Sequence, residues 1–104
     1  MLKAQAYDDV LLVPQYSDIR SRSEINISTN LGKNVNLQLP VISSPMDTIS
    51  ESDMATCMDN AGGCAVIHRY NSIDQQAGLV SEAMKNEGAI VGAAIGISGD
   101  FLNR

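Results

Sequence analysis

The sequence contains no tryptophan and few aromatic residues of any kind, three tyrosines and one phenylalanine in 104 residues. A hydrophobic core must therefore be built from isoleucine, valine, leucine, methionine and alanine. Hydrophobic residues make up 44% and charged residues 18% of the chain, a balance that is typical of a globular protein and not of a disordered one. The length allows one domain at most.

Basic residues are also scarce. Seven lysines and arginines stand against twelve acidic residues, which gives a formal net charge of −5. This charge argues against binding to nucleic acid or to an anionic membrane surface. It leaves open a phosphorylated small molecule, because a glycine turn or a helix N-terminus can bind phosphate locally. No apolar run approaches the roughly 20 residues that span a bilayer, and the N-terminus has no secretory h-region, so we expect a cytoplasmic protein.

Only two cysteines occur, Cys57 and Cys64. We expect two small buried thiols, because free cysteine is commonly buried and a disulfide is rare in a chain of cytosolic character. There is no C-x-x-C pair and no cysteine–histidine cluster, so the sequence predicts no structural zinc site and no other metal site in these residues.

The first 39 residues predict short strands. Val10–Val13 is an apolar run that Pro14 stops. "EINIS" (24–28) and "NVNLQL" (34–39) alternate apolar and polar residues, which is typical of half-buried antiparallel strands, and "LGKN" between them predicts a turn. We therefore expect residues 1–39 to form a β-rich N-terminal arm.

From residue 40 the pattern changes to short, continuous apolar runs. These are "PVIS" (40–43), "CAVIH" (64–68) and "AIVGAAIG" (89–96), and each predicts a strand that is buried on both faces. Two helices are predicted between them. The order β-α-β-α-β with short connections predicts a parallel sheet with right-handed crossovers, and therefore an α/β fold.

Ser50 is the predicted N-cap of the first helix, with Asp53 completing a capping box, and Gly62 and Gly63 end this helix. Its predicted apolar stripe is Met54, Cys57, Met58 and Ala61.

Ser72 is the predicted N-cap of the second helix, with Gln75 as its capping-box partner, and Gly88 closes the segment. The stripe of the second helix is Ile73, Ala77, Val80 and Met84.

Three strands and two helices do not close a barrel, and a (β/α)₈ barrel takes about 250 residues. The chain also stops within an element that begins at "SGDFLNR". We therefore expect a fragment of a larger enzyme or the product of a truncated gene. A small, complete α/β domain is the alternative.

Three segments resemble the N-terminal part of the IMP dehydrogenase / GMP reductase family: "YDDVLLVPQYSDIRSRSEI", "LPVISSPMDT" and "GGCAVIHRYNSIDQQAGLV". The resemblance covers nearly the whole chain, in order. It implies that residues 40–104 form the first three strands of a (β/α)₈ TIM barrel, that residues 1–39 precede the barrel, and that the intact enzyme is a homotetramer. Family members transfer hydride between a nicotinamide cofactor, NAD or NADP, and a purine nucleotide (IMP, XMP or GMP).

The resemblance also implies site residues. Ser44 would bind the nucleotide phosphate and Met46 would pack on the purine. Ser17, Ser21 and Arg22 in the arm, and Arg69 after the second barrel strand, would contact the cofactor. His68, the single histidine, is more simply a hydrogen-bonded structural residue. The plain alternatives are that Ser44 is a turn residue, that Met46 fills the core, and that the arm residues belong to a solvated loop.

The catalytic cysteine and the potassium-binding loop of the family would lie beyond Arg104, so no catalytic residue is expected in this chain, which alone should be inactive. The pair of CBS modules that many IMP dehydrogenases insert before the third barrel strand is absent. "SSPMDT" and "VGAAIG" are closer to the dehydrogenases and "SRSE" is closer to the reductases, which slightly favours a dehydrogenase. A truncated, non-enzymatic fragment and a nucleotide-binding module without chemistry are the rival hypotheses.

Overall fold

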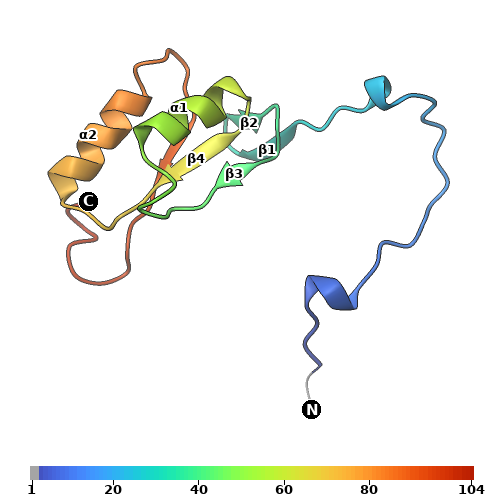
Figure 1. Ribbon diagram of the computed structural model, residues 1–104, viewed down its shortest axis with the longest axis horizontal. Coiled ribbons are helices and arrows are strands. Elements are labelled where there is room, and N and C mark those ends of the chain that lie inside the picture. The colour runs from blue at the N-terminus through green and yellow to red at the C-terminus, as the bar shows by residue number, and fades with distance from the viewer. Residues whose placement is uncertain (1–2) are drawn as a thin grey trace.

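The computed structural model describes residues 3–104 (Figure 1). Of the predicted arm, residues 3–28 extend away from the rest of the chain, and the name N-terminal arm is used below for these residues alone. They contain two single-turn 3₁₀ helices, η1 (Tyr7–Asp9) and η2 (Arg22–Glu24). The strand predicted at Val10–Val13 is wrong: this run has no pairing partner, and Leu11 is 95% exposed. Leu12 and Val13 are also largely exposed and Val10 is about half exposed, so the run packs against little in the described part of the chain.

An antiparallel hairpin follows the arm, as the alternation predicts. It pairs β1 (Thr29–Gly32) with β2 (Val35–Leu37), and Asn34 adopts a left-handed φ of 64° in the turn. Leu37 is fully buried, in agreement with the predicted apolar face of the second strand. The first strand was predicted too early, because Ile25 and Ile27 lie before β1 and are about half exposed.

The second part of the chain, residues 39–104, is a parallel sheet with two helices, called here the sheet-and-helix unit. Its strands are β3 (Ile42–Ser43), β4 (Cys64–Ile67) and β5 (Val91–Ala93), in the spatial order β3-β4-β5, and both pairings are parallel. Helices α1 (Ser52–Asn60) and α2 (Ile73–Ala83) connect them. The two helices touch each other and pack against the sheet, so they lie on the same face (Figure 1). The β-α-β-α-β prediction is confirmed.

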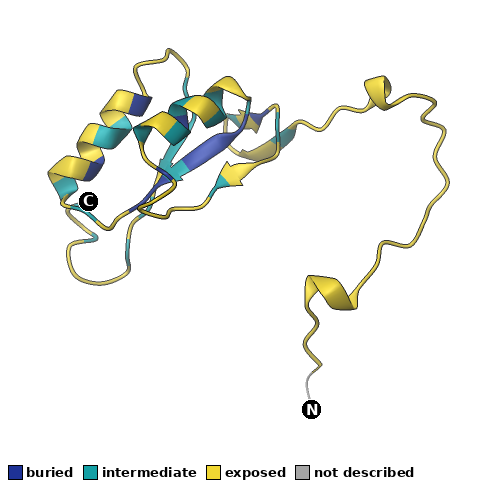
Figure 2. Cartoon of the chain, viewed as in Figure 1, coloured by how far each residue is buried: buried dark blue, intermediate teal, exposed yellow. Residues whose placement is uncertain are grey.

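Burial is concentrated on the central strand (Figure 2). The core cluster consists of four small or branched side chains, with four half-buried ones around it: Ala55, Ala65, Ile67 and Ala83, then Met58, Leu79, Val80 and Val91. The outer strands do not match the prediction of burial on both faces. Val41 and Ile42 are nearly half exposed, and Ala93 is exposed, because β3 and β5 each have a strand on one side only.

Both helical stripes were predicted slightly out of position. On α1, Cys57 and Ala61 are exposed while Ala55 is buried, so the prediction of a buried Cys57 is wrong and that of a buried Cys64 is confirmed. On α2, Ala77 and Met84 of the predicted stripe are exposed. Gln76 and Ala83, which were not predicted, are buried instead.

The helix ends follow the prediction more closely. Gly62, just past α1, has a left-handed φ of 83°, and Ser72 forms its capping box with Gln75 at the start of α2. Both features depend on residues close in sequence, which is why the sequence pattern finds them.

The chain as a whole is extended. Its radius of gyration is 17.8 Å, against about 13 Å for a compact domain of this length. The arm accounts for the difference, since it runs outward without returning to the sheet (Figure 1). Within residues 3–104, no helix has the length and apolar character needed to cross a membrane.

Candidate functional site

The carboxyl ends of β3, β4 and β5 lie at one edge of the sheet, because the strands are parallel. The loops that leave this carboxyl edge are residues 44–51, 68–72 and 94–104. In open α/β sheets and in (β/α)₈ barrels, ligands bind at this edge. Two sequence-predicted site residues, Ser44 and Met46, and a third, Arg69, occupy it.

Ser50 organises the first loop. Its hydroxyl is completely buried, donates to the carbonyl oxygen of Ser44 and lies 2.8 Å from the hydroxyl of Ser43. The backbone N–H of Ser50 donates to the carbonyl of Met46 at 2.8 Å, and the N–H of Met46 donates to Ser44 at 2.8 Å around Pro45. The fixed φ of proline suits this tight turn. Buried hydrogen bonds therefore hold the loop in place, while the side chains of Ser44 and Met46 stay exposed.

This arrangement corrects the predicted N-cap. Ser50 does not cap α1, because its hydroxyl is already used by the loop. Glu51 occupies the N-cap position and its side chain makes no capping bond, so the predicted box of Ser50 with Asp53 does not form. The sequence pattern S-x-x-D is compatible with a helix cap and with a hydrogen bond to a nearby backbone group. In the structure the Ser50 hydroxyl makes the second kind of bond.

His68 joins the second loop to the first. The ring is buried, and its Nδ1 accepts the backbone N–H of Tyr70 at 3.2 Å. Its Nε2 therefore carries the ring hydrogen and donates to a carboxylate oxygen of Glu51 at 3.0 Å. The backbone N–H of His68 also approaches the carbonyl of Ser50 at 3.4 Å. The hydrogen bonding predicted for His68 is confirmed, and Glu51, which sequence reasoning missed, is its partner.

Arg69 is exposed at the same edge. Its guanidinium lies 5.7 Å from the ring centroid of Tyr70, and it makes no ion pair with any residue between 3 and 104. A Cβ placed on Gly96 would lie 3.5 Å from Nη1 of Arg69, an ordinary contact distance, so the guanidinium lies directly beside Gly96. A guanidinium without an ion-pair partner can bind a phosphate or carboxylate group through two parallel hydrogen bonds.

The three arm residues are not brought near Arg69. Ser21 caps η2, accepting the N–H of Ser23 at 3.3 Å, and Ser17 accepts the N–H of Ile19 at 3.2 Å. Arg22 is exposed on the same turn. All three lie on the extended arm, away from the carboxyl edge (Figure 1). Within this one chain they act as turn residues, and a contact with a cofactor stays a prediction.

Neither thiol lies at the carboxyl edge. Cys57 is exposed on α1, and Cys64 is the first residue of β4, at the opposite end of the strand. Burial raises the pKa of the Cys64 thiol above its ordinary value, with a smaller contribution of the same sign from Asp59 and an opposing one from the backbone at Gly92. Among residues 3–104 no group of three or more histidine, cysteine and acidic side chains could hold a metal ion.

Comparison with known proteins gives a consistent result. A family model described as "IMP dehydrogenase / GMP reductase domain" matches residues 4–104. An inosine-5'-monophosphate dehydrogenase of Nitrosopumilus maritimus is 43% identical over 94 residues, which is 90% of this chain and 20% of the relative. A GMP reductase of Leishmania donovani is 40% identical over 85 residues, 82% of this chain and 17% of the relative.

An inosine-5'-monophosphate dehydrogenase of Bacillus subtilis is 42% identical over 85 residues, again 82% of this chain and 17% of the relative. The chain thus spans about a fifth of the length of the curated relatives it matches. The family model covers almost every residue, including all three loops of the carboxyl edge. The chain belongs to the IMP dehydrogenase / GMP reductase family.

Proposed function

We propose that this chain is the N-terminal segment of a purine-nucleotide oxidoreductase and contributes the first three strands of its (β/α)₈ barrel. The favoured reaction is the oxidation of IMP by NAD⁺, with addition of water, to XMP and NADH. The observation that carries the proposal is the loop 44–51. The buried Ser50 hydroxyl holds this loop by hydrogen bonds, while Ser44 and Met46 remain exposed at the carboxyl edge. A pinned loop with exposed polar and apolar side chains is suited to holding a nucleotide in one orientation.

In this proposal Ser44 donates its hydroxyl to the nucleotide phosphate and Met46 packs on the purine ring. Both roles suit the side chains, since a hydroxyl binds phosphate oxygens and a flexible thioether follows the face of an aromatic ring. The loop 68–72 closes one side of the same site, because His68 and Glu51 tie it to the first loop.

The nicotinamide cofactor supplies or accepts the hydride when bound, and its phosphates are the proposed ligands of Arg69. We further propose that Ser17, Ser21 and Arg22 reach the cofactor site of a neighbouring subunit in a homotetramer. The arm supports this, since Leu11, Leu12 and Tyr16 are each more than 90% exposed within residues 3–104.

Only residues 84–90 separate α2 from β5, so the chain has no room there for the CBS modules that the resemblance leads one to look for. We propose that the enzyme lacks the nucleotide regulation that such modules provide. The catalytic cysteine and the potassium loop are assigned to sequence beyond Arg104.

A second candidate, the reduction of GMP by NADPH to IMP and ammonia, rests on two observations. The stretch "SRSE" in the arm is closer to the reductases, and GMP reductases of two Leishmania species are each 40% identical to this chain over 85 residues. The two reactions use the same loop for the same nucleotide phosphate, so the carboxyl edge alone does not favour one.

The test is turnover by the protein expressed from the complete reading frame that contains these codons, given IMP with NAD⁺ or GMP with NADPH. A rise in the absorbance of reduced cofactor with IMP supports the dehydrogenase, and a fall with GMP supports the reductase. If the reading frame ends at Arg104 and neither mixture changes, the inactive-fragment hypothesis replaces the proposal.

A substitution tests the role of the loop within that experiment. Ser44→Ala should raise the KM for the nucleotide about tenfold, through the loss of one charge-assisted hydrogen bond. Ser81→Ala is the control, because Ser81 is an exposed residue of α2 and lies outside the carboxyl edge. It should leave the KM unchanged, and equal effects of the two variants would contradict the role of Ser44.

A further inference from the structure

Gln76 is a polar side chain in a core made mainly of alanine. It lies in the first turns of α2, is 3% exposed, and contacts the ends of two strands. Its amide nitrogen donates to the carbonyl of His68 at 3.0 Å and to the carbonyl of Ala94 at 2.9 Å, with the carbonyl of Ile67 further away at 3.5 Å. Both hydrogens of the amide are therefore used.

These two carbonyls stand where the sheet ends. The last backbone bond between the two strands runs from the N–H of Ala94 to the carbonyl of Ile67, at 2.9 Å. One residue further along β4, the Gln76 amide continues the ladder in place of a backbone donor and bridges the two strands. It thereby fixes the separation of β4 and β5 at the carboxyl edge, beyond the last backbone bond between them.

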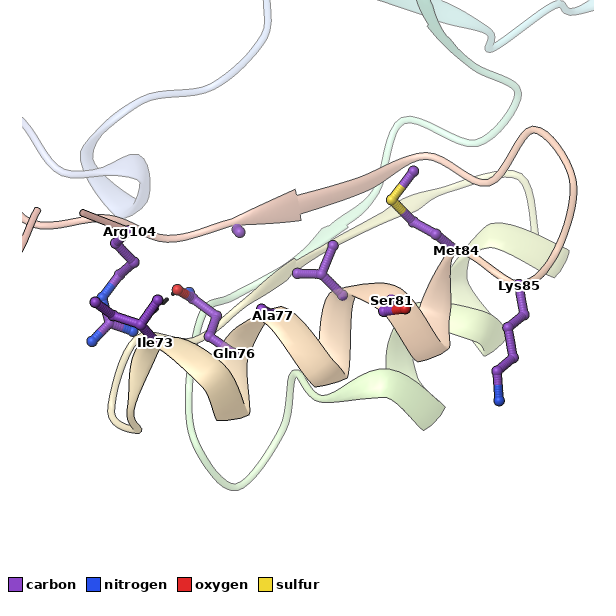
Figure 3. A pocket seen from close by; sticks show the side chains of 9 residues that line it. Ile73, Gln76, Ala77, Ser81, Met84, Lys85 and Arg104 are labelled. Atoms are coloured by element: carbon purple, nitrogen blue, oxygen red, sulfur yellow. Dashed lines mark hydrogen bonds between the residues drawn. The ribbon is translucent and has the colours of Figure 1, made fainter. Parts of the chain in front are cut away.

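The other end of the Gln76 amide is held as well. Its oxygen accepts Nη1 of Arg104 at 3.1 Å, as the dashed line in Figure 3 marks. Nη2 of Arg104 donates to the carbonyl of Asn71 at 2.9 Å and to Asp100 at 2.8 Å, and the Arg104 side chain is only 7% exposed. Every polar group of the Gln76 side chain thus has a partner, which is the condition for a buried amide to be rigid.

The anchored carbonyls flank Arg69. His68 directly precedes it, and Ala94 lies two residues before Gly96, beside which the Arg69 guanidinium lies. We propose that Gln76 is a positioning residue: by joining the ends of β4 and β5 it sets the place of Arg69 relative to the loop 94–99. The consequence for the cofactor rests on the function proposed above, in which Arg69 binds cofactor phosphate.

The kinetic test uses the protein from the complete reading frame with three variants. Gln76→Leu keeps the volume and removes the donors, and Gln76→Glu places a carboxylate against two carbonyls. Gln75→Glu is the matched control, because the Gln75 oxygen accepts the N–H of Ser72 and a carboxylate does the same. Both Gln76 variants should raise the KM for the cofactor about tenfold, with kcat and the KM for the nucleotide within threefold. The proposal is overturned if kcat and the two KM values all change by the same factor, or if none of them changes.

A second readout needs no activity. Hydrogen–deuterium exchange should become faster in residues 68–71 and 94–97 of Gln76→Leu, while α1 and the Gln75→Glu protein exchange as wild type does. Unchanged exchange, or faster exchange throughout the chain, overturns the positioning role. If the wild-type protein turns over neither nucleotide, the proposed function fails, and the exchange experiment decides the anchoring of the two strands by itself.

Discussion

The N-terminal arm (residues 3–28) and the sheet-and-helix unit (residues 39–104) contain the same apolar residue types, but only the unit buries them. Leu12 in the arm is 98% exposed, whereas Ile67 in β4 is completely buried. The arm has no strand to pair with, while β4 has a parallel neighbour on each side and two helices above it. An apolar run therefore becomes structure only where the chain supplies the surface that covers it.

Truncating one apolar residue in each region tests whether only the sheet-and-helix unit is packed. Ile67→Ala should lower the free energy of unfolding by about 2–5 kcal/mol, because it removes buried contacts and leaves a cavity. Leu11→Ala should change it by less than about 0.5 kcal/mol, since its side chain touches little. Urea unfolding of the 104-residue chain, followed by circular dichroism, measures both. Similar losses in the two variants would mean that the arm is packed in solution.

Gly62 provides a test of backbone conformation within the sheet-and-helix unit. Gly62 has a φ of +83°, and a Cβ there would lie 2.8 Å from the Cβ of Gln38 in the segment that follows β2. Gly62→Ala should destabilise the chain by about 1–3 kcal/mol, through left-handed strain together with this clash.

Gly78→Ala is the control for Gly62. Gly78 lies within α2, and a Cβ placed on it would meet no atom within 4 Å, so alanine should stabilise the helix by about 0.5–1 kcal/mol. Thermal unfolding of the two proteins should move in opposite directions, and a shift of the same sign in both contradicts the account.

Two serines extend the comparison to polar groups. Ser50→Ala should cost about 1–3 kcal/mol, because it removes one of the two donors to the Ser44 carbonyl and the hydroxyl partner of Ser43 in a part-buried loop. Ser17→Ala in the arm removes a solvent-exposed bond to the N–H of Ile19 and should be nearly neutral. Urea midpoints report the difference. A neutral Ser50→Ala would show that water replaces the hydroxyl in the loop 44–51.

The smallest expected effect concerns pH. The hydrogen bond from Arg104, aided by charge attraction from Arg104 and Arg69, holds the pKa of Asp100 below its ordinary value. A depressed pKa means that the stabilisation is present above the unfolded-state value, about 3.9, and is lost as the pH falls through the folded-state value. In thermal unfolding between pH 6 and pH 3, Arg104→Met should show a weaker loss of stability than wild type. Identical pH profiles would mean that the pair is fully screened by solvent.

The sequence predicted the order of elements well because local signals determine it. The alternation in residues 34–39, the capping box of Ser72 with Gln75 and the left-handed Gly62 all depend on near neighbours. The failures have a common origin in tertiary contacts. Val10–Val13 has good strand composition but no partner, and Ser50 carries a capping signature but uses its hydroxyl inside the loop.

In the candidate site, too, some residues could be predicted from local signals and others depend on tertiary contacts. Ser44, Met46 and Arg69 could be assigned to one edge of the sheet from the strand order alone, and they lie there. The groups that hold them could not be found, since Glu51 meets His68 across 17 positions and Gln76 meets Ala94 across 18. No periodicity or spacing encodes such pairs. They follow from how the loops close over the ends of the strands.

We propose that the carboxyl edge of β3-β4-β5 binds a purine nucleotide through the loop 44–51. Hydrogen–deuterium exchange of the protein from the complete reading frame, with and without saturating IMP, tests it most directly. We expect slower exchange in residues 44–50 when IMP is bound, with exchange in α2 unchanged. Binding of IMP with protection elsewhere and none in this loop would contradict it.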